Sequence, residues 1–207
     1  FWSPSVVSDT FGFHVTETTE CMACKFQYPS HKYTRFFQMV PFEAWRDAWR
    51  RSSVECEPEE LLKATYSRES RTCQKCSKDV EVEFEVHHVS DGKRAPPKCM
   101  ALLVQWQSGT VSSDDISLLL SLLPLTMDLA LVNENVLPGT YYRLRCMICL
   151  YGAHFIAIAF NPKVSQWVQY DDSKVTALGG WDEVVEKLKK GRFQPEVCFY
   201  ERVSSGR

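Results

Sequence analysis

The sequence lacks a strong net charge, a long apolar run and a secretory leader. Its formal net charge is −2 over 207 residues, which gives no electrostatic support for binding nucleic acid or an anionic membrane. The longest apolar stretch, around Ile116 to Leu125, is interrupted by Pro124 and is far shorter than the ~20 residues of a membrane span. The opening Phe1-Trp2-Ser3-Pro4 has neither a basic segment nor a cleavage site. Since it also lacks an initial Met, we expect a fragment or a processed product.

The 207 residues are enough for one large domain or two small ones, and the composition indicates a globular protein in a reducing compartment. Hydrophobic residues make up 44% of the chain and charged residues 24%, an ordinary globular balance. Nine cysteines are an odd number, and four of them form two C-x-x-C pairs, which suits metal binding better than a disulfide scaffold. There are no internal repeats and no low-complexity tracts. We therefore expect a protein of the cytosol or the nucleus.

Hydrophobic periodicity predicts a mixed α+β fold dominated by antiparallel strands. Val80–Val86 alternates strictly and is typical of a half-exposed strand. Met100–Trp106 is almost entirely apolar, as a buried central strand would be. Further strands are predicted over residues 5–20, 26–40, 141–150 and 194–200. Helical spacing and end signals predict helices over residues 42–51, 58–67, 114–123 and 181–190, while residues 126–137 are ambiguous.

The two C-x-x-C pairs, Cys21/Cys24 and Cys73/Cys76, are separated by 73 − 24 = 49 positions. Two such knuckles at the ends of hairpins can converge on one tetrahedral Zn²⁺. Neither pair is followed by the Gly that knuckles often have, so two unrelated reduced pairs remain an alternative. A redox pair is disfavoured, because neither pair opens a helix that would lower the thiol pKa. The spacing favours a zinc site built from all four thiols.

A hairpin is predicted between Leu150 and Val175. Its strands cover about residues 154–160 and 166–170, with Asn161-Pro162-Lys163 between them, where Pro cannot donate to a ladder. His154 and Asp171 are 171 − 154 = 17 positions apart and their midpoint, (154 + 171)/2 = 162.5, falls in the turn. A symmetric hairpin makes them cross-strand partners with Cβ atoms about 4.5–5.5 Å apart. Such a pair is two thirds of a nucleophilic triad, or a simple cross-strand hydrogen bond.

These motifs resemble those of the ubiquitin-specific proteases, the papain-like cysteine proteases that cleave ubiquitin from proteins. The family's G-H-Y-x-A-Y box is similar to Gly152–Ile158, although Ala153 separates Gly from His and Phe replaces Tyr. Its W-Y-x-F-D-D-S-x-V box stands nearly intact at Trp167–Val175. Its terminal Y-L-L-F-Y strand is similar to Val197–Tyr200. The two C-x-x-C pairs resemble the knuckles of the family's zinc-bearing fingers.

The resemblance implies a single partial domain over residues 1–207, with an antiparallel palm, zinc-ribbon fingers and no thumb. The fingers would cover residues 5–40 and 70–90, and the palm residues 98–107 and 140–202. Structural Zn²⁺ would be held by the four knuckle cysteines, and the partners would be ubiquitin or ubiquitinated proteins, with a larger protein assembly as a further option. In the site the resemblance implies His154 as general base, Asp171 as the residue that orients it, and Asp172 as an aid in polarising the oxyanion site.

The family's nucleophile, a Cys in a G-N-T-C-Y box on the thumb, has no counterpart in these 207 residues. None of the remaining cysteines follows Gly-Asn-Thr or opens a helix; they are Cys56, Cys99, Cys146, Cys149 and Cys198, of which the last three are expected to be buried structural thiols. One hypothesis is therefore the palm and fingers of a thiol-dependent ubiquitin hydrolase, inactive as this chain alone. The other is a catalytically inactive module for ubiquitin binding or assembly. The tail from Trp181 to Pro195 resembles a subgroup often called inactive.

Overall fold

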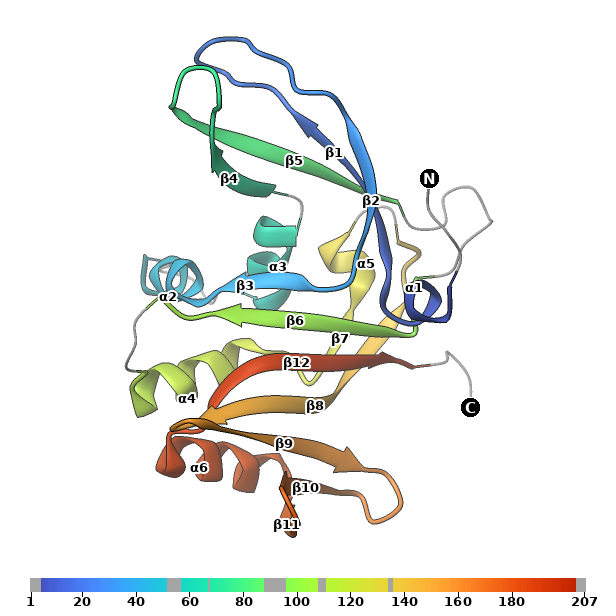
Figure 1. The fold of residues 1–207 in the computed structure, drawn as a ribbon. Helices are drawn as coiled ribbons and strands as arrows, with labels where there is room; N and C mark the ends of the chain where they lie inside the picture. The colour runs from blue at the N-terminus through green and yellow to red at the C-terminus, as the bar shows by residue number, and fades with distance from the viewer. Residues whose placement is uncertain are drawn as a thin grey trace.

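Two sheets and six helices make up the structure, a computed structural model that describes residues 5–51, 57–66, 68–87, 96–107, 111–133 and 136–203 (Figure 1). The helices are α1 (Val6–Phe11), α2 (Phe42–Arg51), α3 (Pro58–Tyr66), α4 (Ser113–Leu122), α5 (Leu129–Val132) and α6 (Trp181–Gly191). The strands are β1 (Phe13–Thr19), β2 (His31–Arg35), β3 (Gln38–Pro41), β4 (Arg68–Thr72), β5 (Asp79–His87), β6 (Cys99–Gln105), β7 (Thr126–Asp128), β8 (Tyr141–Tyr151), β9 (His154–Asn161), β10 (Gln166–Asp171), β11 (Lys174–Gly179) and β12 (Gln194–Arg202). Within the described ranges, β3 and β6 are the only parallel pair, so the predicted α+β class with an antiparallel-rich sheet is confirmed.

The smaller sheet has the strand order β2-β1-β5-β4 and stands at the top of Figure 1. β1 runs antiparallel to β5, with Thr19 paired to Val82. The turn after β1 and the turn between β4 and β5 therefore lie at the same end of the sheet. These are the turns that contain the two C-x-x-C pairs, so the topology places both pairs at one tip.

Residues 5–20 do not form the single strand that their Val, Thr and Phe content predicted. The first half is helix α1, and the strand β1 begins only at Phe13. The helix starts with a capping box, in which the Ser8 N–H donates to Ser5 Oγ at 3.0 Å and the Ser5 N–H donates to Ser8 Oγ at 2.8 Å. These bonds satisfy backbone donors that a helix start leaves unpaired. The local cap outweighs the strand preference of the valines that follow, because those side chains are exposed.

The aromatic stretch predicted as one strand over residues 26–40 is divided between the two sheets. β2 pairs with β1 in the smaller sheet, whereas β3 pairs in parallel with β6 in the larger one. The chain crosses between the sheets at Phe36 and Phe37, which belong to neither strand. Strand-forming residues occupy both halves, so the local sequence could not show which sheet each half would join.

The larger sheet has eight strands in the described residues, in the order β11-β10-β9-β8-β12-β6-β3, with β7 beside β8. Helices α4 and α6 pack against each other, and α6 also packs on β11. The Trp181 ring of α6 lies 5.3 Å from the Trp167 ring of β10. Two fully buried tyrosines anchor the connecting loops: Tyr142 donates to the Pro97 carbonyl at 2.6 Å and Tyr200 to the Pro124 carbonyl at 2.9 Å.

The predicted helices are confirmed as α2, α3, α4 and α6, and the predicted hairpin as β9 and β10. The short elements β4, β7, α5 and β11 were not predicted from the sequence. In the part of the chain that the structure describes, no helix has the length and apolarity needed to cross a membrane.

Candidate functional site

His154 and Asp171 meet at one end of the larger sheet. His154 is the first residue of β9 and Asp171 the last of β10, and His154 Nε2 lies 2.8 Å from Asp171 Oδ1. Asp172 Oδ2 lies 3.9 Å from the same nitrogen. The side chains of His154, Asp171 and Asp172 are 41%, 35% and 83% exposed. The structure thus brings together the three residues predicted for a catalytic site and leaves them open to a ligand.

The register of the β9–β10 hairpin differs from the predicted one by two residues. Gln166 pairs with Asn161 and Tyr170 with Ala157 around a turn at residues 162–165. Continued by one step, this register sets Asp171 opposite residue 156, so His154 is its diagonal neighbour on the same face. Diagonal neighbours are about 7–8 Å apart, within reach of long side chains. The prediction of directly opposed partners is wrong, whereas the predicted contact on one face is confirmed.

Two tight turns fix the two ends of this contact. Gly152, with φ of 62°, makes the turn from β8 into His154, and Asp172, with φ of 50°, makes the turn from β10 into β11. Both residues are in the left-handed region, which Gly adopts freely and Asp adopts more readily than most residues. Both turns lie at the same sheet end, because β9 starts where β10 finishes. The left-handed Asp172 follows Asp171 directly, and its carboxylate comes within 3.9 Å of His154.

Asp171 determines which imidazole nitrogen carries the proton. An ionised carboxylate can only accept hydrogen bonds, so Nε2 of His154 donates to Oδ1 of Asp171. In the neutral ring Nδ1 then keeps its lone pair and can take a proton from a thiol or a water. The pair therefore has the chemistry of an oriented general base.

Strands β8 and β12 of the larger sheet contain Cys146, Cys149 and Cys198, called here the sheet cysteines, while Cys99 begins β6 of the same sheet and is partly buried. Cys149 and Cys198 are buried, as predicted, whereas Cys146 is only partly buried. Burial raises the pKa of all three thiols, that of Cys198 to about 12. A protonated buried thiol is a poor nucleophile. Among the described residues, no cysteine is a side-chain partner of His154. Cys56 lies outside the described residues.

Four thiols meet at the tip of the smaller sheet. Cys21 Sγ lies 3.6 Å from Cys76 Sγ, and Cys24 Sγ lies 3.9 Å from Cys73 Sγ. All four sulfurs are within 4.8 Å of one another, and none is in a disulfide. A tetrahedral ion with Zn–S bonds of about 2.3 Å separates its sulfurs by about 3.8 Å. The four cysteines predicted as ligands are thus close enough to hold one metal ion.

The two C-x-x-C turns have the same local structure. The Lys25 N–H donates to the Cys21 carbonyl at 2.6 Å, and the Ser77 N–H donates to the Cys73 carbonyl at 2.8 Å. Lys25 and Ser77 both have φ of 57°, in the left-handed region that explains why Gly often follows such pairs. A residue other than Gly costs about 1–2 kcal/mol there, so the absence of Gly weakens each turn without preventing it.

Tyr28 belongs to the thiol cluster but was missed by the sequence reasoning. Its hydroxyl donates to Cys73 Sγ at 3.3 Å and accepts from the Gln74 N–H at 2.8 Å. The hydrogen bond from Tyr28 lowers the pKa of the Cys73 thiol to about 6, which favours the thiolate that binds metal. The only signal in the sequence was an aromatic residue shortly after the first C-x-x-C pair.

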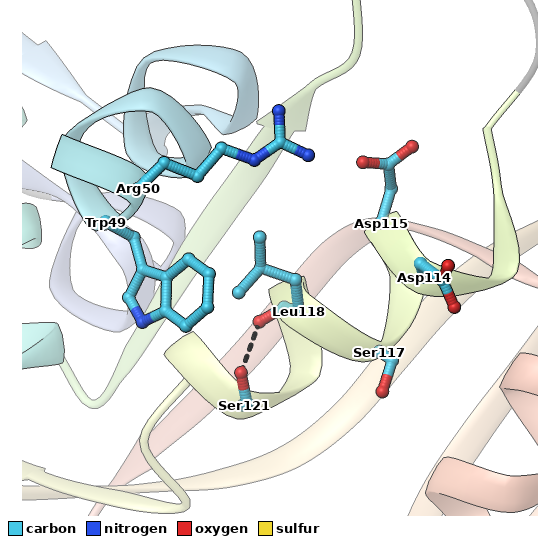
Figure 2. A pocket seen from close by; sticks show the side chains of 7 residues that line it. All are labelled: Trp49, Arg50, Asp114, Asp115, Ser117, Leu118 and Ser121. Atoms are coloured by element: carbon cyan, nitrogen blue, oxygen red, sulfur yellow. Dashed lines mark hydrogen bonds between the residues drawn. The ribbon is translucent and has the colours of Figure 1, made fainter.

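A third feature is a cavity of about 400 Å³ between α2 and α4 (Figure 2). Trp49 and Leu118 form its apolar wall, and Arg50 extends across it from α2 (Figure 2). The two helices are joined beside it by the ion pair between Arg46 and Asp115, at 3.4 Å. The cavity shares no residue with the His154 pair or with the four-thiol cluster; its other lining residues are Asp114, Asp115, Ser117 and Ser121.

The chain is similar to known proteins over almost its whole length. Residues 2–200 match the family model described as Ubiquitin carboxyl-terminal hydrolase. The chain is 39% identical over 83 residues to Ubiquitin carboxyl-terminal hydrolase 53 of Homo sapiens. This match covers 34% of this chain and 8% of that protein. It is also 40% identical over 55 residues to Ubiquitin carboxyl-terminal hydrolase 54 of Rattus norvegicus. This second match covers 26% of this chain and 4% of that protein.

Solved structures share the fold. A structure of the yeast SAGA DUBm superposes with a TM-score of 0.59 at 14% identity, covering 98% of this chain and 43% of that chain. A SAGA DUB module bound to monoubiquitin superposes with a TM-score of 0.56 at 14% identity, covering 99% of this chain and 43% of that chain. The chain therefore spans less than half the length of these structures and less than a tenth of the curated relatives.

Proposed function

Since the chain belongs to the ubiquitin carboxyl-terminal hydrolase family and carries the boxes of its ubiquitin-specific proteases, we propose that it supplies the base half of a cysteine deubiquitinase site. His154 is assigned as the general base, Asp171 as its orienting carboxylate, and Asp172 as an aid in polarising the oxyanion site. The observation that carries the proposal is the 2.8 Å contact between His154 Nε2 and Asp171 Oδ1, because it leaves Nδ1 free as a base at a partly exposed position.

The proposed reaction is hydrolysis of the isopeptide bond at the C-terminus of ubiquitin. A thiol from outside the described residues attacks the carbonyl carbon of the terminal glycine, and His154 Nδ1 takes the thiol proton. The imidazolium, stabilised by ionised Asp171, then protonates the lysine amine as it leaves, which produces a thioester. A water molecule gives its proton to His154 and attacks the thioester. Collapse of that intermediate expels the thiolate, which takes a proton back from His154, and releases the carboxyl group of ubiquitin, which then ionises by giving its proton to water.

The smaller sheet is assigned as the fingers and the larger sheet as the palm of one partial domain. In this assignment β3 belongs to the palm although it lies within residues 5–40, because it pairs with β6. The end of the predicted second finger segment, residues 88–90, lies outside the described residues.

We assign Zn²⁺ to the four-thiol cluster in a structural role, since four thiolate ligands leave no open coordination position for a substrate. Free thiols throughout the described residues support a location in the cytosol or the nucleus.

Ubiquitin or ubiquitinated proteins are the proposed partners. The family match supports this assignment, and one similar structure is a DUB module bound to monoubiquitin. Membership of a larger assembly is a further proposal, supported by likeness to modules built from several subunits.

The second candidate function is an inactive module that binds ubiquitin or serves assembly. It is favoured by one observation: among the described residues, no thiol contacts His154. In this case the His154–Asp171 contact is only a hydrogen bond at the end of the hairpin. The two candidates differ in whether His154 changes a reaction rate.

The test uses the natural protein that contains this segment and ubiquitin joined through its C-terminus to a fluorophore. His154→Ala is expected to lower the rate of fluorophore release about 10²–10⁴-fold, the usual contribution of a general base. His31→Ala is the matched control, because His31 is an exposed histidine of β2, and it should leave the rate unchanged. If the natural protein binds ubiquitin yet neither releases the fluorophore nor forms an adduct with electrophilic ubiquitin, the inactive module is correct.

A further inference from the structure

Gln169 is a buried polar side chain on the strand that carries Asp171. It is 6% exposed and precedes Asp171 by two positions, so both side chains lie on the same face of β10. The rest of that face is apolar beside it: Trp167 is on the same strand, and Ile158 pairs with Gln169 across β9; their side chains are 5% and 0% exposed. A side-chain amide in such surroundings is unfavourable unless its polar atoms are hydrogen-bonded.

Only one end of the Gln169 amide is satisfied. Its Nε2 donates to Asp171 Oδ2 at 3.5 Å, whereas its buried Oε1 has no hydrogen-bond partner among the described residues. Exchanging the oxygen and nitrogen positions would place Oε1 against the carboxylate and leave the N–H group without its acceptor. The contact with Asp171 therefore determines the orientation of the amide. An apolar side chain at this position would avoid the unpaired oxygen, so packing alone does not account for a glutamine.

We propose that Gln169 is a positioning residue that holds Asp171 in register with His154. One carboxylate oxygen, Oδ1, accepts from His154 Nε2, and the other, Oδ2, accepts from Gln169. With both oxygens engaged, the carboxylate has one orientation. Asp171 is 35% exposed, so without Gln169 it can turn toward water and release the imidazole. The inference rests on the proposed function, because it explains how the base is kept in its working tautomer.

The test replaces Gln169 by Met, which keeps the length of the side chain and removes both amide atoms. In the natural protein that contains this segment, ¹⁵N NMR should show neutral His154 shifting away from the Nε2–H tautomer. Exchange of its Hε2 proton with water should become about tenfold faster, the factor that corresponds to one lost hydrogen bond of about 1.4 kcal/mol. The denaturant midpoint should not fall, because the unpaired oxygen is removed as well. In the natural protein, kcat should fall while KM stays the same.

Two further variants separate the possible failures. Gln166→Met is the matched control, because Gln166 is an exposed glutamine of the same strand, and it should leave the His154 signals unchanged. Asp171→Ala tests the pair itself, because it removes both oxygens that can accept from His154: a tautomer equal to that of the unaltered chain would overturn the proposed function. If Asp171→Ala changes the tautomer but Gln169→Met does not, the inference about Gln169 alone is wrong. A lower midpoint for Gln169→Met with an unchanged tautomer would likewise show a purely structural residue.

Discussion

Removing the metal should unfold the tip of the smaller sheet and leave the larger sheet folded. The buried side chains of the tip are Cys21, Cys73 and Val80, with Phe26 and Tyr28 packed at their edge. Burying one side chain of the size of Val contributes about 1.5–3 kcal/mol, while ordering the backbone of each residue costs about 1–2 kcal/mol. Apolar burial therefore cannot hold two turns in place. The structural zinc ion that we propose for the four-thiol cluster would supply the missing stabilisation, since zinc contributes about 10–16 kcal/mol in small zinc-binding peptides.

The assay is hydrogen exchange at four backbone amides of the two turns. The Cys21 N–H donates to the Phe26 carbonyl at 2.9 Å and the Cys73 N–H to the Lys78 carbonyl at 2.7 Å; the N–H groups of Lys25 and Ser77 make the two bonds described above. Elemental analysis should first find about one zinc ion per chain. After chelation these amides should exchange at least about a thousandfold faster, since a loss of 4 kcal/mol in local opening free energy already gives that factor. Amides that join β8 and β12 should keep their protection.

The control is Cys99→Ser, which removes a thiol of β6 outside the cluster and should leave the zinc content unchanged. Cys73→Ser should abolish zinc binding and reproduce the effect of chelation. Slow exchange at the amides of Cys21 and Cys73 in the zinc-free chain would show that the metal does not hold the tip together. A fully folded protein purified without zinc would show the same.

Two other predictions concern the core. Burial raises the pKa of the Cys149 and Cys198 thiols, that of Cys198 to about 12, so both stay protonated at pH 7 and iodoacetamide at that pH should label them only after unfolding. Rapid labelling of either thiol in the folded chain, read by mass spectrometry, would contradict their burial. Gly191→Ala should destabilise the protein by about 1–3 kcal/mol in urea unfolding, although Ala favours helices, because the new Cβ would clash with the Phe193 ring. The exposed Lys190→Ala should stay within about 0.5 kcal/mol, and an unchanged midpoint for Gly191→Ala would show that the ring moves aside at no cost.

Much of the fold was predictable because its signals are local. Helices α2 and α6 each follow from one amphipathic stretch, and β9 and β10 follow from two strand-like runs around a Pro-containing turn. The N-terminal helix was missed because its signal is a pair of serines spaced for a capping box, set among valines that favour strands. The crossing of the chain from β2 to β3 was missed because both halves suit a strand, and only pairing with distant segments separates them.

By itself, the sequence determined the inventory of the candidate sites: two C-x-x-C pairs, and a histidine and an aspartate on neighbouring strands of one hairpin. Tertiary structure decided which of these groups meet. The antiparallel pairing of β1 with β5 brings the two cysteine pairs to one tip, and a four-residue turn shifts the hairpin so that His154 and Asp171 meet diagonally. Tyr28 and Gln169 gained their roles only in the folded chain. A hydrogen bond requires two groups within about 3.5 Å of each other, and for residues on different elements that distance depends on how the elements pair and pack.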